Sequence, residues 1–488
     1  MPALAAKHAK LNALSVRLKS RNKDMGKIGI IFLDSFSIIN KLKEGKIVFS
    51  VYGLGYVGLT LAAVWLRAGA KVIGVDIDLK KLEKIKKLEY KFPEEEIKEA
   101  IKAGFSQKKF MVTNDGIDAS KKSDVKIVTV PVYLKNGEPN LKAIEDVTYA
   151  IAKGLCKGDL VIIESSVPPG TTFHIKKLLE ETSGLNVEKD FGLGYSPERI
   201  YIGRGVKDIE ERYPKIISGV GERSIKTIKV LYEHVCKKGT IVASSPIVAE
   251  VEKLFEGIYR DVNIALANEL ARLCCALNID YREVRKLANS QPYCNLHLPG
   301  TGVGGACIPV YPIFVLSAAR KCSEELMLVK LARKINSEQP QKIAELCLKA
   351  YEEIGVPRPK ICVLGLAFRG DIDDTRLSPT YSLIQSLLHR IRDCIIIVHD
   401  PYVIKDYFIE KHGLKLTSEL KHALSGADMV ILATNHSLYR SLSLKLIKII
   451  SGKEKVAVID AHNMLSDWRN PPKGVIYVGS GRPWVKNL

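Results

Sequence analysis

The chain has 488 residues, of which 46% are hydrophobic and 26% are charged, and its formal net charge is +20. This length exceeds what one hydrophobic core supports, so we expect two to four domains; no apolar run is long enough to predict a membrane span. Ten cysteines without a C-x-x-C pair argue against a disulfide framework or a zinc site and fit a reducing cytoplasm. The basic residues are spread along the chain without a nucleic-acid-binding module, which favours small anionic ligands over nucleic acid.

Residues 1–27 differ in kind from the rest of the chain. They carry seven lysines and arginines against one acid, Asp24, and show no core pattern. A disordered basic arm, a misassigned start and a transit-like peptide are all compatible with this composition. We therefore predict that residues 1–45 form a basic N-terminal extension outside the first domain.

A regular alternation of strands and helices begins at Lys46. The predicted strands are Lys46–Tyr52, Lys71–Val75, Val125–Val130 and Leu160–Ile163, with helical segments between them. This alternation predicts a doubly wound parallel sheet, and hence a Rossmann domain over residues 46–235.

A glycine fingerprint follows the first strand and opens a helix that runs to Arg67. Gly53 suits the tight turn, Gly55 the close approach of a pyrophosphate, and Gly58 the packing of the helix on the strand. Asp76 ends the next strand, where a carboxylate binds the ribose hydroxyls and favours NAD over NADP. Lys81 either neutralises phosphate charge or is a solvated helix residue. The predicted NAD contacts in this segment are Gly53, Gly55, Tyr56, Val57, Gly58, Asp76 and Lys81.

The second half of the chain is first helical and then returns to β/α alternation. The predicted helices are Val248–Asn278, Tyr281–Ala288 and Ile313–Arg320, with further helix to about Ile354, and they form a central helical domain over residues 236–350. The predicted strands after Val356-Pro-Arg-Pro359 are Ile361–Leu364, Ile395–Val398, Met429–Ala433 and Val456–Ile459. They predict a C-terminal Rossmann-like domain over residues 355–488.

A glycine-rich loop, Pro299-Gly-Thr-Gly-Val-Gly-Gly-Ala-Cys307-Ile-Pro-Val-Tyr-Pro312, separates two of these helices. Its glycines allow the backbone to approach a ligand closely. Cys307 comes just before a helix N-terminus, which can bias a thiol towards the nucleophilic thiolate. From this segment alone, a buried structural cysteine and a nucleophile are both open.

Several separate segments, in one order along the chain, resemble the family of UDP-sugar 6-dehydrogenases, which includes the UDP-glucose and UDP-N-acetylmannosamine enzymes. They are the fingerprint at 53–58, Glu164–Thr172, Ser196–Ile200, Arg260–Leu270, the loop at 299–312 and Gly365–Arg376. Pro197-Glu-Arg199 and Cys307-Ile-Pro-Val310 are most similar to the branch that acts on UDP-N-acetylhexosamines.

The resemblance implies an NAD-dependent four-electron oxidation of a C6 alcohol to a carboxylate. Cys307 matches the nucleophile that holds the aldehyde as a thiohemiacetal and then as a thioester. Lys253 matches a lysine that assists proton transfer or stabilises the oxyanion. Lys253, Gly257 and Arg260 share one helix face by their spacing.

The same matching implies the rest of the site and its partners. The implied substrate-binding residues are Arg199, Ile200, Lys253, Arg260, Gly304, Phe368 and Arg369, and two further cofactor contacts are Ser166 and Arg376. The implied partners are a UDP-sugar and a second copy of the chain, joined through the helical middle, without nucleic acid, membrane or metal.

The chain departs from the family pattern close to the chemistry. Ala306 and Tyr311 stand where this branch has His and Asp, and Gly257 stands where the family has Asn. Val132 removes a hydroxyl, and Gln291 and Tyr293 replace a His and an Arg that contact substrate. The first hypothesis is an active dehydrogenase with UDP-N-acetylmannosamine as first choice of substrate; the alternatives are a UDP-glucose 6-dehydrogenase and a catalytically weakened NAD- or nucleotide-sugar-binding paralogue.

Overall fold

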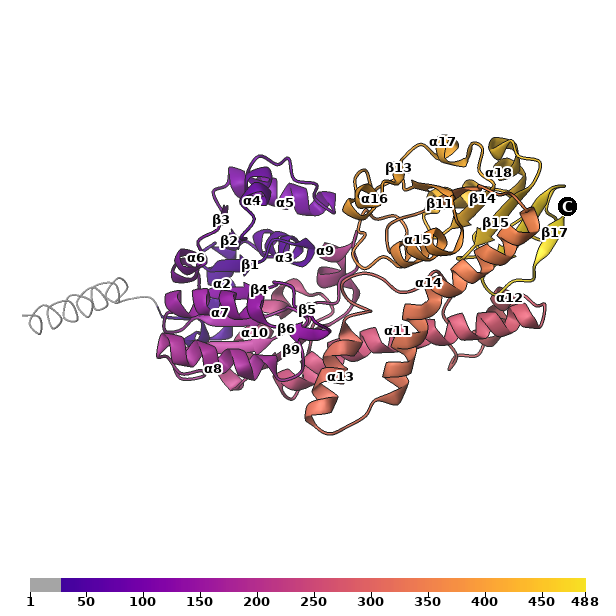
Figure 1. The fold of residues 1–488 in the computed structure, drawn as a ribbon. Coiled ribbons are helices and arrows are strands. Elements are labelled where there is room, and N and C mark those ends of the chain that lie inside the picture. The colour runs from indigo at the N-terminus through magenta and orange to yellow at the C-terminus, as the bar shows by residue number, and fades with distance from the viewer. Residues whose placement is uncertain (1–27) are drawn as a thin grey trace, which may run out of the picture. The chain divides into compact units, whose positions relative to one another are not determined.

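The computed structural model describes residues 28–488, which form two compact units. The first comprises residues 28–133 and 140–253, and the second comprises residues 134–139 and 254–488. Each unit contains a mainly parallel sheet with helices packed on it (Figure 1). The predicted α/β class with two Rossmann-like sheets and helices between them along the chain is confirmed. No helix within residues 28–488 is long and apolar enough to cross a membrane.

The sheet of the first unit has eight strands in the order β10-β9-β8-β7-β4-β1-β2-β3. The strands are β1 (Val48–Tyr52), β2 (Lys71–Val75), β3 (Phe110–Thr113), β4 (Val125–Val128), β7 (Leu160–Ile163), β8 (Gly192–Tyr195), β9 (Lys215–Gly219) and β10 (Thr240–Val242). Every neighbouring pair is parallel except β8 and β9. The strand order reverses between β1 and β4, and ligands bind beside the carboxyl ends of strands at such a point.

The helical elements of the first unit lie between these strands. They are η1 (Ile30–Phe32), α2 (Ser35–Lys43), α3 (Tyr56–Arg67), α4 (Leu79–Lys86), α5 (Glu95–Ser106), α6 (Gly116–Lys122), α7 (Lys142–Gly154), α8 (Thr171–Ser183), α9 (Gly205–Lys207), η2 (Asp208–Arg212) and α10 (Glu222–Val235). A two-stranded ribbon of β5 (Tyr133–Lys135) and β6 (Glu138–Asn140) lies at the border of the two units along the chain.

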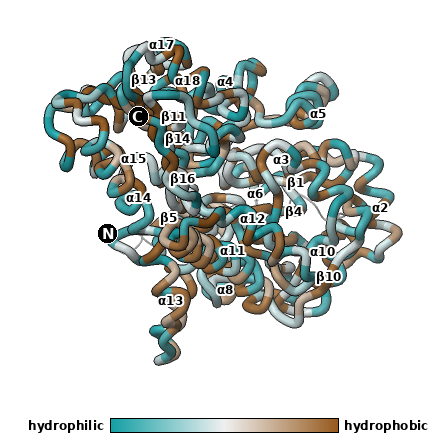
Figure 2. Tube along the Cα trace, turned by 90° about the vertical axis from the view of Figure 1, so that its right-hand side faces the viewer, coloured by the Kyte–Doolittle hydropathy of each residue, from teal (hydrophilic) through white to brown (hydrophobic). Residues whose placement is uncertain are grey.

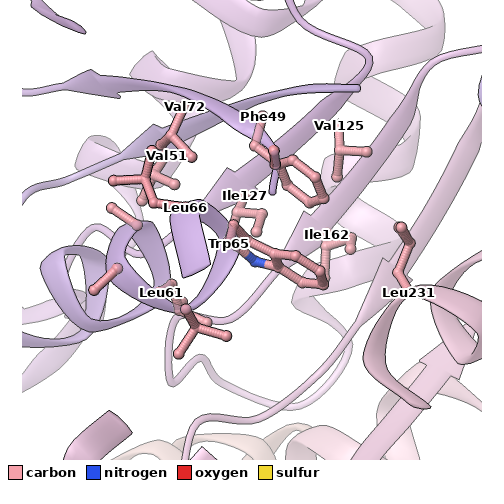
Figure 3. Close-up of a cluster of buried hydrophobic side chains, with 14 of the residues drawn as sticks. Phe49, Val51, Leu61, Trp65, Leu66, Val72, Val125, Ile127, Ile162 and Leu231 are labelled. Atoms are coloured by element: carbon pink, nitrogen blue, oxygen red, sulfur yellow. The ribbon is translucent and has the colours of Figure 1, made fainter. Parts of the chain in front are cut away.

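The core of the first unit is built around α3 and the central strands. Trp65 is fully buried and stacks on Phe49 of β1 with ring centroids 4.3 Å apart, and its edge meets Tyr232 at 5.4 Å. Figure 3 shows the rings of Phe49 and Trp65 among aliphatic side chains from neighbouring strands and helices. This packing holds the C-terminal half of α3, the helix that follows the glycine fingerprint, against the sheet.

Part of the predicted N-terminal extension belongs to this core. Ile30, Ile31, Ile38 and Leu42 are at most 5% exposed and pack in the same cluster as Trp65. Ile38 and Leu42 lie four residues apart on one face of α2, which makes α2 an amphipathic helix. We did not predict this helix from the sequence, because basic residues surround its apolar positions. Folded structure therefore begins well before residue 46. The arm at residues 1–27 lies outside the described residues.

The sheet of the second unit has seven strands in the order β13-β12-β11-β14-β15-β16-β17. They are β11 (Lys360–Leu364), β12 (Ile395–His399), β13 (Lys415–Thr417), β14 (Met429–Leu432), β15 (Val456–Asp460), β16 (Val475–Gly479) and β17 (Val485–Asn487). All neighbours are parallel except β16 and β17.

Long helices precede this sheet along the chain. The helical elements are α11 (Pro246–Ala276), which starts in the first unit, α12 (Tyr281–Ala288), α13 (Tyr311–Lys321), α14 (Met327–Ile354), α15 (Pro379–Arg390), α16 (Tyr407–Lys411), α17 (Leu420–Leu424), η3 (Ser437–Ser441) and α18 (Leu444–Ser451). From residue 254 onward, the helices that we predicted as a separate central domain belong to the same compact unit as the C-terminal sheet.

Candidate active site

The glycine fingerprint forms the turn between β1 and α3. Gly53 has φ +98°, and an ideal Cβ at Gly58 would lie 1.8 Å from the Gly53 carbonyl oxygen. At Gly55 an ideal Cβ meets nothing within 4 Å, so the backbone here borders open space at the N-terminus of α3. A glycine-lined approach to a helix N-terminus fits the pyrophosphate of a dinucleotide.

Asp76 follows β2 and holds this turn. Its Oδ2 accepts hydrogen bonds from the Leu54 N–H (2.9 Å) and from Lys81 Nζ (2.7 Å), and its Oδ1 accepts one from Asp78 N (3.0 Å). Burial opposes ionisation of Asp76, but these donors outweigh it and lower its pKa. An ionised carboxylate at this position suits ribose hydroxyls. Lys81 is paired with Asp76, not free in solvent.

Tyr56 connects the start of α3 to the segment after Arg199 and Ile200. Its hydroxyl contacts Glu94 and the Tyr201 carbonyl oxygen (2.8 Å) and accepts the N–H groups of Gly203 (3.1 Å) and Gly205 (3.0 Å). The Tyr56 side chain therefore holds residues 201–205, a role that the fingerprint alone does not predict. Val57 packs half-buried against the core.

A buried charged cluster lies at the carboxyl ends of β7 and β8. Lys215 Nζ is 2.8 Å from Glu164 Oε2 and also bonds to Glu198 Oε2, and Tyr232 donates its hydroxyl hydrogen to Glu164. Burial raises the pKa of Glu164 to about 7. For Glu198 burial acts in the same sense, but the charge of Lys215, with a smaller contribution from Lys253, lowers its pKa. Lys215 thus supplies the positive charge that faces both buried carboxylates.

Glu198 in turn positions a predicted substrate-binding segment. Its Oε1 accepts the N–H groups of Arg199 (2.7 Å) and Ile200 (3.0 Å). The Arg199 guanidinium lies over the Tyr213 ring at 5.0 Å. Glu164, Glu198 and Lys215 are not among the predicted site residues. The signal for this cluster in the sequence is Lys215, a lysine at the start of the otherwise uncharged strand β9.

Lys253 is only 6% exposed on α11, which excludes a solvated surface lysine. One turn earlier along the helix, Glu250 is fully buried and accepts hydrogen bonds from Gly170 N (2.6 Å) and Thr172 N (2.7 Å) at the N-terminus of α8. Ser166, the predicted cofactor contact, is half-buried in the segment between β7 and α8. The first unit thus holds the predicted cofactor residues, except Arg376, together with Arg199, Ile200 and Lys253.

The second unit holds the remaining predicted residues around the glycine-rich loop. The Gly305 N–H donates to the Arg376 carbonyl oxygen (2.8 Å), and an ideal Cβ at Gly305 would lie 2.8 Å from the Phe368 ring. At Gly304 an ideal Cβ would lie 2.6 Å from Phe368 Cβ. The Arg376 guanidinium is paired with Asp374 (2.6 Å).

Buried amides anchor the start of the same loop. The Gly300 N–H donates to Asn268 Oδ1 of α11 (3.0 Å), and Gln339 of α14 donates to the Gly300 carbonyl oxygen (3.1 Å). Thr301 donates its hydroxyl hydrogen to the Ala433 carbonyl oxygen after β14 (2.7 Å). The loop is thereby joined to two helices and to the sheet.

Cys307 is exposed at the end of this loop, one turn before α13. Its carbonyl oxygen accepts the N–H groups of Val310 (2.9 Å) and Tyr311 (3.0 Å). Cys362 of β11, in contrast, is buried. The exposure of Cys307 excludes the alternative of a buried structural cysteine, and its role as a nucleophile stays a prediction.

The remaining predicted substrate-binding residues, and the residues that depart from the family pattern, differ in how far they are exposed. Arg260 is half-buried on α11 and donates to the Glu256 carbonyl oxygen (3.3 Å), and Arg369 is half-buried beside Phe368 in sequence. Tyr293 is 94% exposed and Gln291 is also exposed, whereas Tyr311 is 4% exposed. Within residues 28–488, His, Cys, Asp and Glu form no group that could hold a metal ion.

Three family models match successive parts of the chain, all described as the UDP-glucose/GDP-mannose dehydrogenase family. The NAD-binding domain matches residues 47–236, the central domain residues 247–338 and the UDP-binding domain residues 362–467. The NAD-binding domain model covers the fingerprint and Asp76, and the glycine geometry fits that cofactor.

Curated and solved relatives agree with these matches. A UDP-N-acetyl-D-mannosamine dehydrogenase of Pyrococcus horikoshii is 35% identical over 89% of this chain and 99% of its own length. A solved UDP-D-ManNAc dehydrogenase from the same organism has a TM-score of 0.81 at 34% identity, over 89% of this chain and 99% of its own. A solved NDP-N-acetyl-D-galactosaminuronic acid dehydrogenase from Methanosarcina mazei Go1 has a TM-score of 0.77 at 30% identity, over 91% and 98%. The chain therefore belongs to the UDP-glucose/GDP-mannose dehydrogenase family, as an NAD-dependent nucleotide-sugar dehydrogenase.

Proposed function

We propose that the protein oxidises the C6 alcohol of a UDP-N-acetylhexosamine, with UDP-N-acetylmannosamine as first choice, to the uronate. The observation that carries this proposal is the exposed Cys307 at the end of an anchored glycine-rich loop, in a chain that keeps the whole dinucleotide fingerprint. The names of the similar proteins from Pyrococcus and Methanosarcina support an N-acetylated sugar.

The chemistry assigned to this chain rests on Cys307 and Lys253. NAD, when bound, accepts a hydride in each of two oxidations. The Cys307 thiolate adds to the C6 aldehyde left by the first oxidation and forms a thiohemiacetal, which keeps the aldehyde on the protein. The second oxidation converts this adduct to a thioester, and water hydrolyses it to the carboxylic acid and the free thiol. Lys253 stabilises the developing oxyanion or transfers its proton, as a desolvated ammonium can.

Substrate recognition is assigned to two sets of residues. Arg199 and Ile200, whose backbone Glu198 positions, form one set in the first unit. The other set, in the second unit, is Arg260, Gly304, Phe368 and Arg369. The cofactor contacts are those around the fingerprint, with Ser166 and Arg376 in addition.

We also propose a homodimer through the helical middle of the chain. Five exposed apolar residues along and just beyond α11 follow a helical spacing and form the α11 stripe: Phe255, Tyr259, Leu266 and Leu273 of the helix and Leu277, which follows its last residue, are 41–59% exposed. Hydrophobic segments of this helix are brown in Figure 2. An apolar stripe of this kind suits burial against a second copy of the same helix.

The proposed role of Cys307 also favours the cytoplasm as the location of the protein, because a catalytic thiol must stay reduced.

A panel assay tests the proposed function. The protein is incubated with NAD⁺ and UDP-N-acetylmannosamine, UDP-N-acetylglucosamine, UDP-N-acetylgalactosamine or UDP-glucose, and the NADH and sugar acid are quantified. We expect two NADH per sugar, with the highest kcat/KM for an N-acetylated sugar. Preference for UDP-glucose would support the first alternative, and binding without turnover across the panel would support the weakened paralogue.

A further inference from the structure

Two close contacts between a glycine and an aromatic ring flank Cys307 in the second unit. On the N-terminal side, Gly305 packs on the Phe368 ring. On the C-terminal side, Tyr311 packs on Gly257 of α11: an ideal Cβ at Gly257 would lie 2.4 Å from Tyr311 Cδ2 and 3.3 Å from Cε2. A Cβ atom cannot approach a ring carbon so closely, so any side chain at residue 257 would displace the ring or the helix.

The space at residue 257, not the backbone, explains its glycine. Gly257 lies in the interior of the helix α11 and has no positive φ. Glycine at such a position is less favourable for the helix than alanine. Glycine at residue 257 lets the Tyr311 ring pack directly on the backbone of α11, and the methyl group of an alanine there would disrupt this packing.

Tyr311 is coupled to the nucleophile through the main chain. It opens α13, is 4% exposed, and donates its N–H to the Cys307 carbonyl oxygen at 3.0 Å. Val310 donates to the same oxygen at 2.9 Å. The turn that carries the exposed thiol is therefore attached to a ring seated on α11.

We propose that Gly257 and Tyr311 form a steric pair that positions Cys307. The ring fills the volume that a side chain at residue 257 would need, and so fixes the turn from Cys307 to Tyr311 on the helix. Gly257 stands where the family has Asn, and Tyr311 stands where this branch has Asp. These two departures are then one coupled change, in which the packing of a ring on a glycine replaces two polar side chains. The role of the thiol rests on the proposed function, whereas the packing of the pair does not.

Thermal stability tests the pair by a change of sign. In the native background we expect Gly257→Ala to lower the Tm by several degrees, because the new methyl group collides with the ring. In a Tyr311→Ala background the same substitution should leave the Tm unchanged or raise it, because only the helix propensity of alanine remains. Equal Tm shifts of Gly257→Ala in both backgrounds would overturn the steric pair.

Hydrogen exchange tests whether the pair holds the cysteine turn. Exchange of the amides of Val310 and Tyr311, followed by mass spectrometry on the peptide that contains them, should be at least about tenfold faster in Gly257→Ala than in the native protein. Tyr311→Phe, which keeps the ring, is the matched control and should retain protection. Unchanged protection in Gly257→Ala would overturn the positioning role.

Steady-state kinetics give the functional readout. With the sugar that the native protein oxidises best, Gly257→Ala should lower kcat about tenfold or more, since a small misplacement of a reacting group costs this much. The KM for that sugar should change less than about threefold. An unchanged kcat would overturn the positioning role even if the Tm result holds. If no sugar is oxidised by the native protein, the proposed function fails, and the exchange result alone decides whether the pair positions the turn.

Discussion

The carboxylate of Asp76 accepts a hydrogen bond of 2.9 Å from the backbone N–H of Leu54, the residue between the first two glycines of the fingerprint. One side chain therefore fixes the phosphate-binding turn and presents charge at the end of β2 where ribose is expected. Lys81, paired with the same carboxylate, keeps it ionised.

Asp76→Asn should weaken NAD⁺ binding at least about tenfold, which corresponds to about 1.4 kcal/mol. The amide keeps the size of the side chain but loses its charge and its ion pair with Lys81. The measurement is the Kd of NAD⁺ by calorimetry. Asp78→Asn is the control, because Asp78 caps α4 through Lys81 N (3.0 Å) and should change the Kd less than about twofold. Equal losses in both variants would contradict the assignment of Asp76.

Lys215→Met should lower the free energy of unfolding by roughly 3–5 kcal/mol, because Glu164 and Glu198 would stay buried without their cation. Lys237→Met is the control: Lys237 also pairs with a glutamate, Glu211, but its side chain is 71% exposed. The control should cost less than about 1 kcal/mol in urea unfolding. A small loss in Lys215→Met would mean that the cluster does not support the first unit.

The buried Asp400 predicts an acid-dependent loss of stability in the second unit. Burial opposes its ionisation, but the hydrogen bonds from His436 and from the N–H groups of Ala367 and Leu366 lower its pKa from 3.8 to about 2. The folded protein thus holds this proton more weakly than the unfolded chain. The ionised group contributes stability that is fully present above the unfolded pKa and is lost as the pH falls towards 2.

A gap of nearly two pKa units corresponds to about 2–3 kcal/mol. We expect urea unfolding of the native protein to show this loss between pH 5 and pH 2, and expect Asp400→Asn to be less stable at pH 7 with a flatter pH dependence. An identical pH dependence in the two proteins would contradict the role of Asp400.

Leu273→Glu should convert the proposed dimer to a monomer, because it places a charge within the α11 stripe. Light scattering after size exclusion gives the mass. Glu269→Ala, on the same helix with its side chain 56% exposed, should leave the mass unchanged. A native protein of monomer mass would contradict the dimer directly.

Local sequence patterns predicted the parts of the site that depend on local conformation. The turn at Gly53, the acid at Asp76 and the loop before Cys307 each need particular residues at fixed short spacings. The alternation of apolar strands and helices predicted both sheets for the same reason.

Contacts between distant segments were beyond these patterns. The bonds from Lys215 to Glu164 and from Tyr56 to residues 201–205 join segments that only the sheet order brings together. In the sequence, Gly257 and Tyr311 are two separate positions at which a polar side chain is lost. Only the packing of the Tyr311 ring on Gly257 shows that the two positions are linked. The core role of Ile38 was hidden because basic residues surround it.

The covalent role that we propose for Cys307 predicts the NADH stoichiometry of the native protein and of Cys307→Ala. With a limiting amount of the preferred UDP-sugar, the native protein should yield two NADH and one acid per sugar. Cys307→Ala should yield no acid, while its Kd for NAD⁺ stays within about twofold of the native value because the fingerprint lies elsewhere in the chain. Acid production by Cys307→Ala at the native rate, or one NADH per sugar with free aldehyde from the native protein, would contradict the account.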